Sequence, residues 1–483
     1  MRIRFAPLLL SLLVLAIASL ASQKLAQPNV SYITYEEARP VLEALREVLP
    51  AELASSSAQE LPALWPNWVA SRDRNIRARL DQGNEDSLVN FLLFGTMFTR
   101  NPRITLSEIA RVGEGRLMSS GNESPTGAAF LKSVYARADD LLGALSSAGQ
   151  NERLLFARQL LESKGYEVMT EGGRTRAKQY LLTSLARVLG EHASYAKVLE
   201  SAKLLGDPSA EFAERSKLYS SRGLSSDTSL LPNFAIEQAL ASLKSQNLLP
   251  VGSVRRVGVI GPGLDFTDKQ DGYDFYPEQT IQPFAIIDSL IRFGLARAND
   301  LRVVTFDLNP RVNSHLRRAT ESARRGVGYT IQLPRDPEAQ WKPEATEYWS
   351  HFGDQISSPV AAVRPPANLG NLTLRAVRVR AAIVSLITPE DTNIVLQRPD
   401  LAPGDRFDLL IATNILVYYD VFEQSLALLN VGKMLRPGGF LLSNNALLEL
   451  PASRVHSVGY NTAVYSNKPS DGDHIVWYQL ADK

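Results

Sequence analysis

Six residues in the second half of the 483-residue chain have the types and positions that a small-molecule site needs. They are Gly261, Gly263, Asp265, Asp307, Asp400 and Asn414. The two glycines follow a run of mainly β-forming residues at 257–260. Glycine allows a sharp backbone bend, and its missing Cβ lets a ligand lie against the chain. An aspartate adds two carboxylate oxygens, which can accept hydrogen bonds from two neighbouring hydroxyl groups.

Strands must position these residues, and the sequence predicts several of them at the required places. The predicted strands are 256–260, 301–307, 393–400 and 407–413. The last of them is almost continuously apolar, as expected for a strand of a parallel sheet that is buried on both faces. Ligands bind at the carboxyl ends of strands in open α/β sheets. We therefore expect Gly261, Gly263, Asp307 and Asn414 to lie along one edge of the sheet.

Three stretches, 257–265, 407–420 and 434–443, together resemble the nucleotide-side motifs of class I S-adenosylmethionine-dependent methyltransferases. The third contains the sequence Leu-Arg-Pro-Gly-Gly before a further predicted strand. Two alternating segments near the C-terminus, 459–466 and 474–480, predict an antiparallel hairpin, with which a methyltransferase sheet ends. The resemblance covers about 254–483. It implies an α/β Rossmann-like methyltransferase domain with a mostly parallel sheet and a terminal antiparallel hairpin. Independently of the resemblance, helical spacing in the first half predicts an all-α domain that precedes it.

The resemblance implies S-adenosyl-L-methionine as the cofactor and gives the six residues their expected roles. Gly261, Gly263 and Asp265 form the turn against the cofactor, and Asp307 accepts hydrogen bonds from both ribose hydroxyls. Asp400 approaches the adenine, and Asn414 lies at the same edge. For Asp307 there is an alternative, because an aspartate at this point also suits the N-cap of a helix that begins near residue 310.

The chain departs from the family pattern at three positions. Asp265 stands where the family has its third glycine, and Val259 stands where an acid is often found. The segment 413–420 resembles the chemotaxis-receptor (CheR-like) branch, but Thr413 replaces the arginine of that branch, so protein-glutamate methylation is not implied. A nicotinamide site is disfavoured, because Phe266 occupies the third glycine position of its GxGxxG motif.

Methyl transfer is an in-line displacement at a sulfonium methyl group, for which the protein mainly aligns donor and acceptor and excludes water. No catalytic base is strictly required, and the sequence identifies none. Tyr418, Tyr419 and His351 are the candidates that we name.

Two further segments are expected near the cofactor and the substrate. The polar and aromatic loop 266–278 is long for a connection after a glycine turn, and we expect Tyr273, Phe275 or Tyr276 to pack on the cofactor. An insert at about 335–374 is the candidate substrate cap. The methyl acceptor itself, a small molecule or a protein, cannot be read from the sequence.

The predicted domain order is a leader at 1–26, an all-helical domain at 27–206, a linker at 207–232 and the methyltransferase domain at 233–483. Arg2 and Arg4 precede an apolar run at 5–21, which predicts a signal peptide or a membrane anchor and hence an exported or inner-membrane-anchored chain. Cytoplasmic location is the alternative. Because S-adenosylmethionine is cytosolic, export also favours a second interpretation, a catalytically degenerate binding or scaffold protein with the same fold.

Composition excludes several other classes of site. The chain has no cysteine, so disulfides and thiolate sites are excluded, and its five histidines are scattered without metal-ligand spacing. Lys and Arg number 52 against 51 Asp and Glu, so no overall charge indicates a nucleic-acid partner. We therefore expect neither a metal site nor nucleic-acid binding.

Overall fold

The computed structural model describes residues 29–105, 108–109, 125–204, 219, 222–266, 273–444, 446–468 and 471–482. The predicted leader at 1–26 and part of the predicted linker lie outside these residues. Within the described ranges, no helix is both long enough and apolar enough to cross a membrane.

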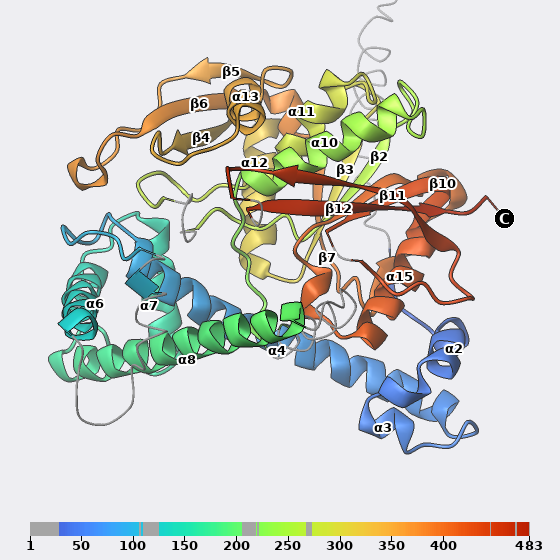
Figure 1. Ribbon diagram of the computed structural model, residues 1–483, viewed down its shortest axis with the longest axis horizontal. Helices are drawn as coiled ribbons and strands as arrows, with labels where there is room; N and C mark the ends of the chain where they lie inside the picture. The colour runs from blue at the N-terminus through green and yellow to red at the C-terminus, as the bar shows by residue number, and fades with distance from the viewer. Residues whose placement is uncertain are drawn as a thin grey trace, which may run out of the picture.

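A seven-stranded sheet forms the centre of the second half, in the order β11-β12-β10-β9-β2-β3-β7 (Figure 1). Its strands are β2 (Arg256–Ile260), β3 (Arg302–Asp307), β7 (Ile387–Asp391), β9 (Phe407–Ala412), β10 (Leu435–Ser443), β11 (Val455–Val464) and β12 (Gly472–Leu480). Adjacent strands from β10 to β7 run parallel, whereas β12 is antiparallel to both of its neighbours. This is the Rossmann-like methyltransferase topology, with its terminal hairpin, that the sequence predicts.

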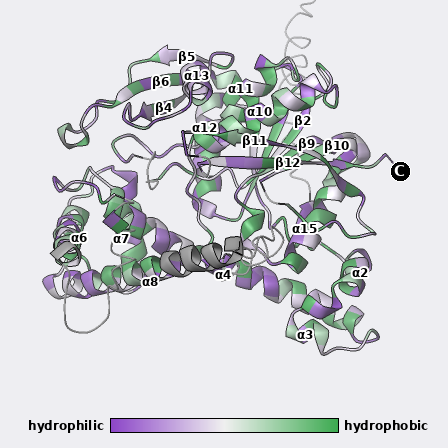
Figure 2. Cartoon of the chain, viewed as in Figure 1, coloured by the Kyte–Doolittle hydropathy of each residue, from purple (hydrophilic) through white to green (hydrophobic). Residues whose placement is uncertain are grey.

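Alternate residues of the central strands supply two separate cores, one on each face of the sheet. Val257 and Leu409 point into a core shared with helices α10 to α13, and Leu410 points into a core shared with α15 and the N-terminal helices. The helices of this half are α10 (Leu231–Ser245), α11 (Gln282–Arg292), α12 (Pro310–Arg324), α13 (Pro343–His351), α14 (Ala381–Val384) and α15 (Val421–Met434). Short 3-10 helices lie at Ala367–Leu369, Pro403–Asp405 and Leu416–Tyr418. Figure 2 shows α10 and α11 coloured mainly as hydrophobic, consistent with helices that cover a buried sheet.

The first half of the chain is mostly helical, as predicted, but it is not packed as an independent domain. Its elements are β1 (Val30–Tyr32), α2 (Tyr35–Ala44), a 3-10 helix (Arg46–Val48), α3 (Ala51–Ala54), α4 (Leu61–Phe94), α6 (Pro125–Leu145), α7 (Glu152–Ser163) and α8 (Glu171–Leu204). Helix α4 joins two cores: Trp65 and Ile76 pack in the core against the sheet, and Phe91 packs in a core with α6, α7 and α8. Strand β1 pairs with β8 (Gln397–Pro399) of the second half. The helical half therefore completes one face of the α/β half.

A small three-stranded sheet, β4-β6-β5, is inserted between α12 and α14. Its strands are β4 (Tyr329–Arg335), β5 (Ser357–Val360) and β6 (Thr373–Val379), and α13 lies between the first two. The predicted insert at 335–374 thus begins inside β4 and ends inside β6. The inserted unit extends beyond both predicted ends because each outer strand hydrogen-bonds to β6.

One predicted strand of the central sheet is wrong. The sequence places a strand at 393–400, but the sheet takes Ile387–Asp391 as its edge strand β7, paired with β3. Residues 393–396 form a loop, and β8 leaves the sheet to pair with β1. Pro389 is acceptable in β7 because an edge strand has one side without hydrogen-bonding neighbours.

Candidate functional site

A cavity of about 360 Å³ lies at the carboxyl ends of the central strands. One wall consists of residues at the ends of β2, β3, β7, β9 and β10, among them Gly261, Asp307 and Asn414. The opposite wall comes from α4, α8 and the segment 222–229, which connects the helical half to α10. The sheet edge and the helical half therefore enclose one site between them.

Gly261 and Gly263 lie where β2 ends, and both line the cavity. Their φ angles are 66° and 64°, in the left-handed region that side chains other than glycine rarely adopt. A Cβ on Gly261 would lie 2.1 Å from Ile415 Cδ1, and a Cβ on Gly263 would lie 2.6 Å from the carbonyl oxygen of Ser226. The predicted sharp turn is confirmed. The missing Cβ is expected to make room for a ligand, but the atoms that leave no room for a Cβ are those of Ile415 and Ser226.

Asp307 lies at the tip of β3 and lines the same cavity. Its Oδ1 accepts a hydrogen bond of 2.8 Å from the backbone amide of Asn309, and the amide of Gly263 also donates to its carboxylate. Burial raises the pKa of Asp307 to about 7, against these donors, and the neighbouring carboxylate of Asp391 raises it further. The helix N-cap that we considered for Asp307 is instead Asn309, whose side chain accepts from Arg311.

Asn414 follows β9 and has a φ of 57°, which is uncommon for a residue with a side chain. Its backbone amide donates to Asn444 Oδ1 at 2.8 Å, and Asn444 Nδ2 donates to Asn414 Oδ1. This reciprocal pair joins the ends of β9 and β10 at the cavity wall. A strained residue that its surroundings hold in place is a feature of ligand sites.

The two expected cofactor contacts at Asp265 and Asp400 are not at the cavity. Asp265 is 4% exposed, and its Oδ2 accepts hydrogen bonds from Tyr276 at 2.8 Å and from Gln279 at 2.9 Å. Asp400 lies beyond β8, where it accepts a hydrogen bond from Ser31. Its predicted approach to the adenine fails because 393–400 is not a strand of the central sheet.

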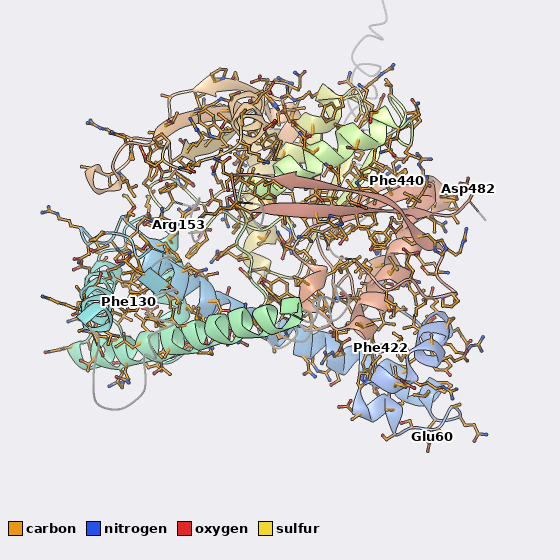
Figure 3. The ribbon with its side chains drawn as sticks, in the orientation of Figure 1. Glu60, Phe130, Arg153, Phe422, Phe440 and Asp482 are labelled. Atoms are coloured by element: carbon orange, nitrogen blue, oxygen red, sulfur yellow. The ribbon has the colours of Figure 1, made fainter. Side chains whose placement is uncertain are left out.

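The aromatic residues of the loop after Asp265 also lie away from the cavity. Tyr273, Phe275 and Tyr276 form a buried cluster against leucines at and before β6 of the inserted unit. Arg153 of α7 is 1% exposed and donates to the carbonyl oxygens of Tyr276 and Asp265 at 2.5 and 2.9 Å. Figure 3 labels Arg153 where α7 meets the α/β half. These side chains hold the two halves together.

Of the three candidate bases, Tyr418 and Tyr419 line the cavity and His351 does not. His351 instead lies 3.4 Å from the carboxylate of Glu237. Burial raises the pKa of both tyrosines above its usual value. Each hydroxyl therefore keeps its proton at neutral pH, which disfavours both tyrosines as bases. Arg79 of α4 fixes this part of the wall by donating to the carbonyl oxygen of Tyr418 at 2.9 Å.

Sequence reasoning missed several residues of the wall. Gln282 begins α11, Thr392 follows β7, and Asn444 follows β10. The last two follow strands, so the rule that ligands bind at strand ends could have indicated them once the strands were correctly placed. The contribution of α4 and α8 has no signal in the sequence. Among the described residues, no group of three or more metal-ligating side chains could hold a metal ion.

Comparison with known proteins gives distant structural likenesses only. Neither a family model nor a curated protein matches the sequence. The N-methyltransferase NodS from Bradyrhizobium japonicum WM9 is 14% identical at a TM-score of 0.25, over 51% of this chain and 94% of that one. The glycopeptide N-methyltransferase MtfA complexed with S-adenosyl-L-methionine is 12% identical at a TM-score of 0.21, over 52% of this chain and 78% of that one. The CMeT domain of the citrinin polyketide synthase is 10% identical at a TM-score of 0.26, over 94% of this chain and 100% of that one. The strand order of the central sheet is what establishes the class I methyltransferase fold.

Proposed function

We propose that the chain binds S-adenosyl-L-methionine in the cavity at the sheet edge and transfers its methyl group to an acceptor. The observation that carries this proposal is that Gly261, Gly263, Asp307 and Asn414 all line one cavity, although 153 positions separate the first from the last. They lie at the carboxyl ends of three different strands, β2, β3 and β9, so the fold itself brings them together. When bound, the cofactor supplies a methyl group that its positive sulfur already activates.

The residues present fit this cofactor along the order of the strands. Asp307 offers a carboxylate for the ribose hydroxyls at the end of β3. Thr392, at the end of the neighbouring strand β7, is 2% exposed, and its hydroxyl has no hydrogen-bond partner within the described chain. The adenine would lie on this side. The glycine turn and Asn414, on the β2 and β9 side, would hold the methionine part and the methyl group.

The protein's part in the reaction is to align the two reactants and to exclude water. The turn at Gly261 and Gly263 and the Asn414–Asn444 pair are rigid parts of the wall, because each is fixed by backbone hydrogen bonds or close packing. Alignment of this kind supplies a large part of the rate enhancement in transfers between two bound molecules. Asp265, which replaces a family glycine, does not obstruct the cavity because its side chain is held by Tyr276 and Gln279.

A second candidate is a binding or scaffold protein with this fold and no catalysis. It is favoured by the apolar segment at 5–21, which would take the chain to the membrane or beyond it, away from cytosolic cofactor. Calorimetry of the full chain with S-adenosylmethionine, S-adenosylhomocysteine and NAD separates the possibilities. Micromolar binding of the first two supports the proposal, binding of NAD alone supports an oxidoreductase, and binding of none supports the scaffold. A reporter fused after residue 30 tests the location.

A further inference from the structure

We infer that the methyl acceptor in this cavity is an amine, and that the side-chain carbonyl of Gln282 holds its nitrogen. The inference rests on the proposed function, since it names the acceptor class for the same site. Three features support it: a buried acceptor atom without a donor, the place of that atom along the sheet edge, and the charge of the lining.

Gln282 is the first residue of α11 and is 3% exposed, and it lines the cavity. Its Nε2 donates to Thr413 Oγ1 at 2.7 Å, and this hydrogen bond fixes the orientation of the amide. Oε1 remains as an acceptor, and no donor of the described chain reaches it. A buried carbonyl without a donor destabilises a protein, because nothing compensates for the hydrogen bonds to water that it loses on folding. An N–H group of a ligand would remove that penalty.

The position of Gln282 along the sheet edge separates it from the adenosine side. Its partner Thr413 follows β9, whereas Thr392 follows β7, and β2 and β3 lie between these two strands. At about 4.8 Å per strand, three spacings separate Thr392 from Thr413 by roughly 14 Å. A ribose held at Asp307 therefore leaves Gln282 on the side where the methyl group is transferred.

The charge of the cavity favours a cationic or neutral acceptor over a carboxylate. Its charged lining residues within the described chain are Asp86, Glu191, Asp227, Asp307 and Arg222. Arg187 lies behind the wall and pairs with two of the acids, Asp86 at 2.5 Å and Glu191 at 3.0 Å. Asp227 accepts hydrogen bonds from Ser87 and Asn90. The excess of acids attracts an ammonium group and repels a carboxylate.

The transfer to an amine can use the carboxylates of the lining as bases. A bound ammonium group first gives a proton to one of them. The neutral amine then attacks with its own lone pair. The N–C bond forms as the S–C bond breaks, sulfur keeps that electron pair, and the nitrogen then releases its proton to a lining carboxylate or to water.

The test uses small probes that differ only in the functional group: n-propylamine, 1-propanol and propionate. Each is added at millimolar concentration to the full chain loaded with S-adenosylhomocysteine, and saturation-transfer NMR reports contact with the protein. The inference predicts contact for n-propylamine alone. Equal or stronger contact of 1-propanol or propionate, or no contact of the amine with loaded protein, overturns it. Failure of the wild-type chain to bind S-adenosylhomocysteine is a separate result, which contradicts the proposed function.

Two substitutions at Gln282 and one control locate the contact. Gln282→Leu is expected to abolish the propylamine signal, and Gln282→Glu, which keeps an acceptor of the same size, to strengthen it. Thr305→Val removes an equally buried hydroxyl without a hydrogen-bond partner in the described chain, outside the cavity lining, and should leave the signal unchanged. An amine signal that persists in both Gln282 variants overturns the inference.

The amino group of the cofactor itself is the other nitrogen that Gln282 could bind. Comparison of S-adenosylhomocysteine with 5′-methylthioadenosine, which lacks that amino group, distinguishes the two sources. The inference predicts that Gln282→Leu changes the affinity for both nucleosides by less than about twofold. A loss of affinity for S-adenosylhomocysteine alone would assign Gln282 to the cofactor and overturn the acceptor assignment.

Discussion

The backbone amide of Gly263 hydrogen-bonds to the carboxylate of Asp307, and this contact joins the turn after β2 to the tip of β3. Two residues that are 44 positions apart in the sequence thus form one corner of the cavity. The corner combines a turn with two glycines and a carboxylate that lines the cavity. The proposed cofactor site depends on this combination.

Replacement of Asp307 by asparagine should weaken binding of S-adenosylhomocysteine by about 10- to 100-fold, because hydrogen bonds to a charged group contribute about 1.5–3 kcal/mol. Isothermal calorimetry measures the change. Asp400→Asn is the matched control, since the structure places Asp400 at Ser31, and it should bind as the wild type does. Equal affinity of wild type and Asp307→Asn would show that Asp307 does not hold the ribose.

The affinity for S-adenosylhomocysteine should rise with pH through the titration of Asp307. Its pKa of about 7 in the free protein means that about one tenth of the carboxyl groups are ionised at pH 6 and about nine tenths at pH 8. Ribose hydroxyls prefer the ionised form as acceptor, so affinity should increase by about tenfold between these values. Asp307→Asn should show no such increase.

The same titration affects the stability of the free chain in the opposite direction. Because the pKa of Asp307 is raised by folding, the contribution of this group to stability is fully present below its unfolded pKa of 3.8. It is lost as the pH rises towards 7. Thermal melts should therefore show that Asp307→Asn gains stability relative to the wild type from pH 4 to pH 7, and a constant difference would contradict the raised pKa.

Substitution of Gly261 by alanine should destabilise the fold by about 2–5 kcal/mol in urea unfolding. A left-handed backbone costs alanine about 1–2 kcal/mol, and the overlap with Ile415 adds about 1–3 kcal/mol of overpacking. The double variant Gly261→Ala/Ile415→Ala should recover the second part only, when compared with Ile415→Ala. Purely additive effects of the two changes would show that Ile415 does not press on the turn.

Arg79 should be needed for the wall that the helical half supplies. It donates to the carbonyl oxygens of Arg222, Tyr219 and Tyr418 at 2.9, 3.0 and 2.9 Å. Arg79→Lys cannot reach all three, so we expect a loss of about 1–3 kcal/mol in the free energy of unfolding. Arg39→Lys on exposed α2 is the control, with an expected change within about 0.5 kcal/mol. Similar losses in both variants would argue against a special role of Arg79.

The sequence predicts the central sheet well because its strands carry strong local signals. Residues 409–412 are apolar without interruption, and the turn at Gly261 and Gly263 needs a conformation that glycine allows. Asp307 could be recognised because it is the carboxylate that ends the predicted strand 301–307. At these residues the local pattern predicts a strand of a parallel sheet, and ligands bind at the carboxyl ends of such strands. The structure brings the predicted residues together at one cavity.

The edge strand β7 is the place where local pattern fails. Its sequence, Ile-Thr-Pro-Glu-Asp, contains a proline and two acids, and only its position at the sheet edge makes this acceptable. The segment that follows it, 393–400, has the stronger strand pattern, so the sequence predicts the strand there. The assignment of Asp400 to the adenine depended on that strand. Asp265 failed for another reason: its spacing fits the family turn, but its partners Tyr276 and Gln279 are found only in the folded chain.

The contribution of the helical half could not be predicted from sequence at all. Helix α4 is a single helix of 34 residues, yet its N-terminal part packs on the sheet and its C-terminal part on α6, α7 and α8. Asp86 and Asn90 reach the cavity because of where the helix crosses the sheet edge. Such a crossing depends on contacts between residues that are far apart in the sequence.

A crystal structure of the full chain with S-adenosylhomocysteine tests the central claim most directly. We predict that both ribose hydroxyls lie within hydrogen-bond distance of Asp307, with the methionine part against Gly261 and Gly263 and the sulfur on the Asn414 side. A complex in which the nucleoside lies outside this cavity, or in which Asp307 makes no contact with the ribose, would contradict the proposed site.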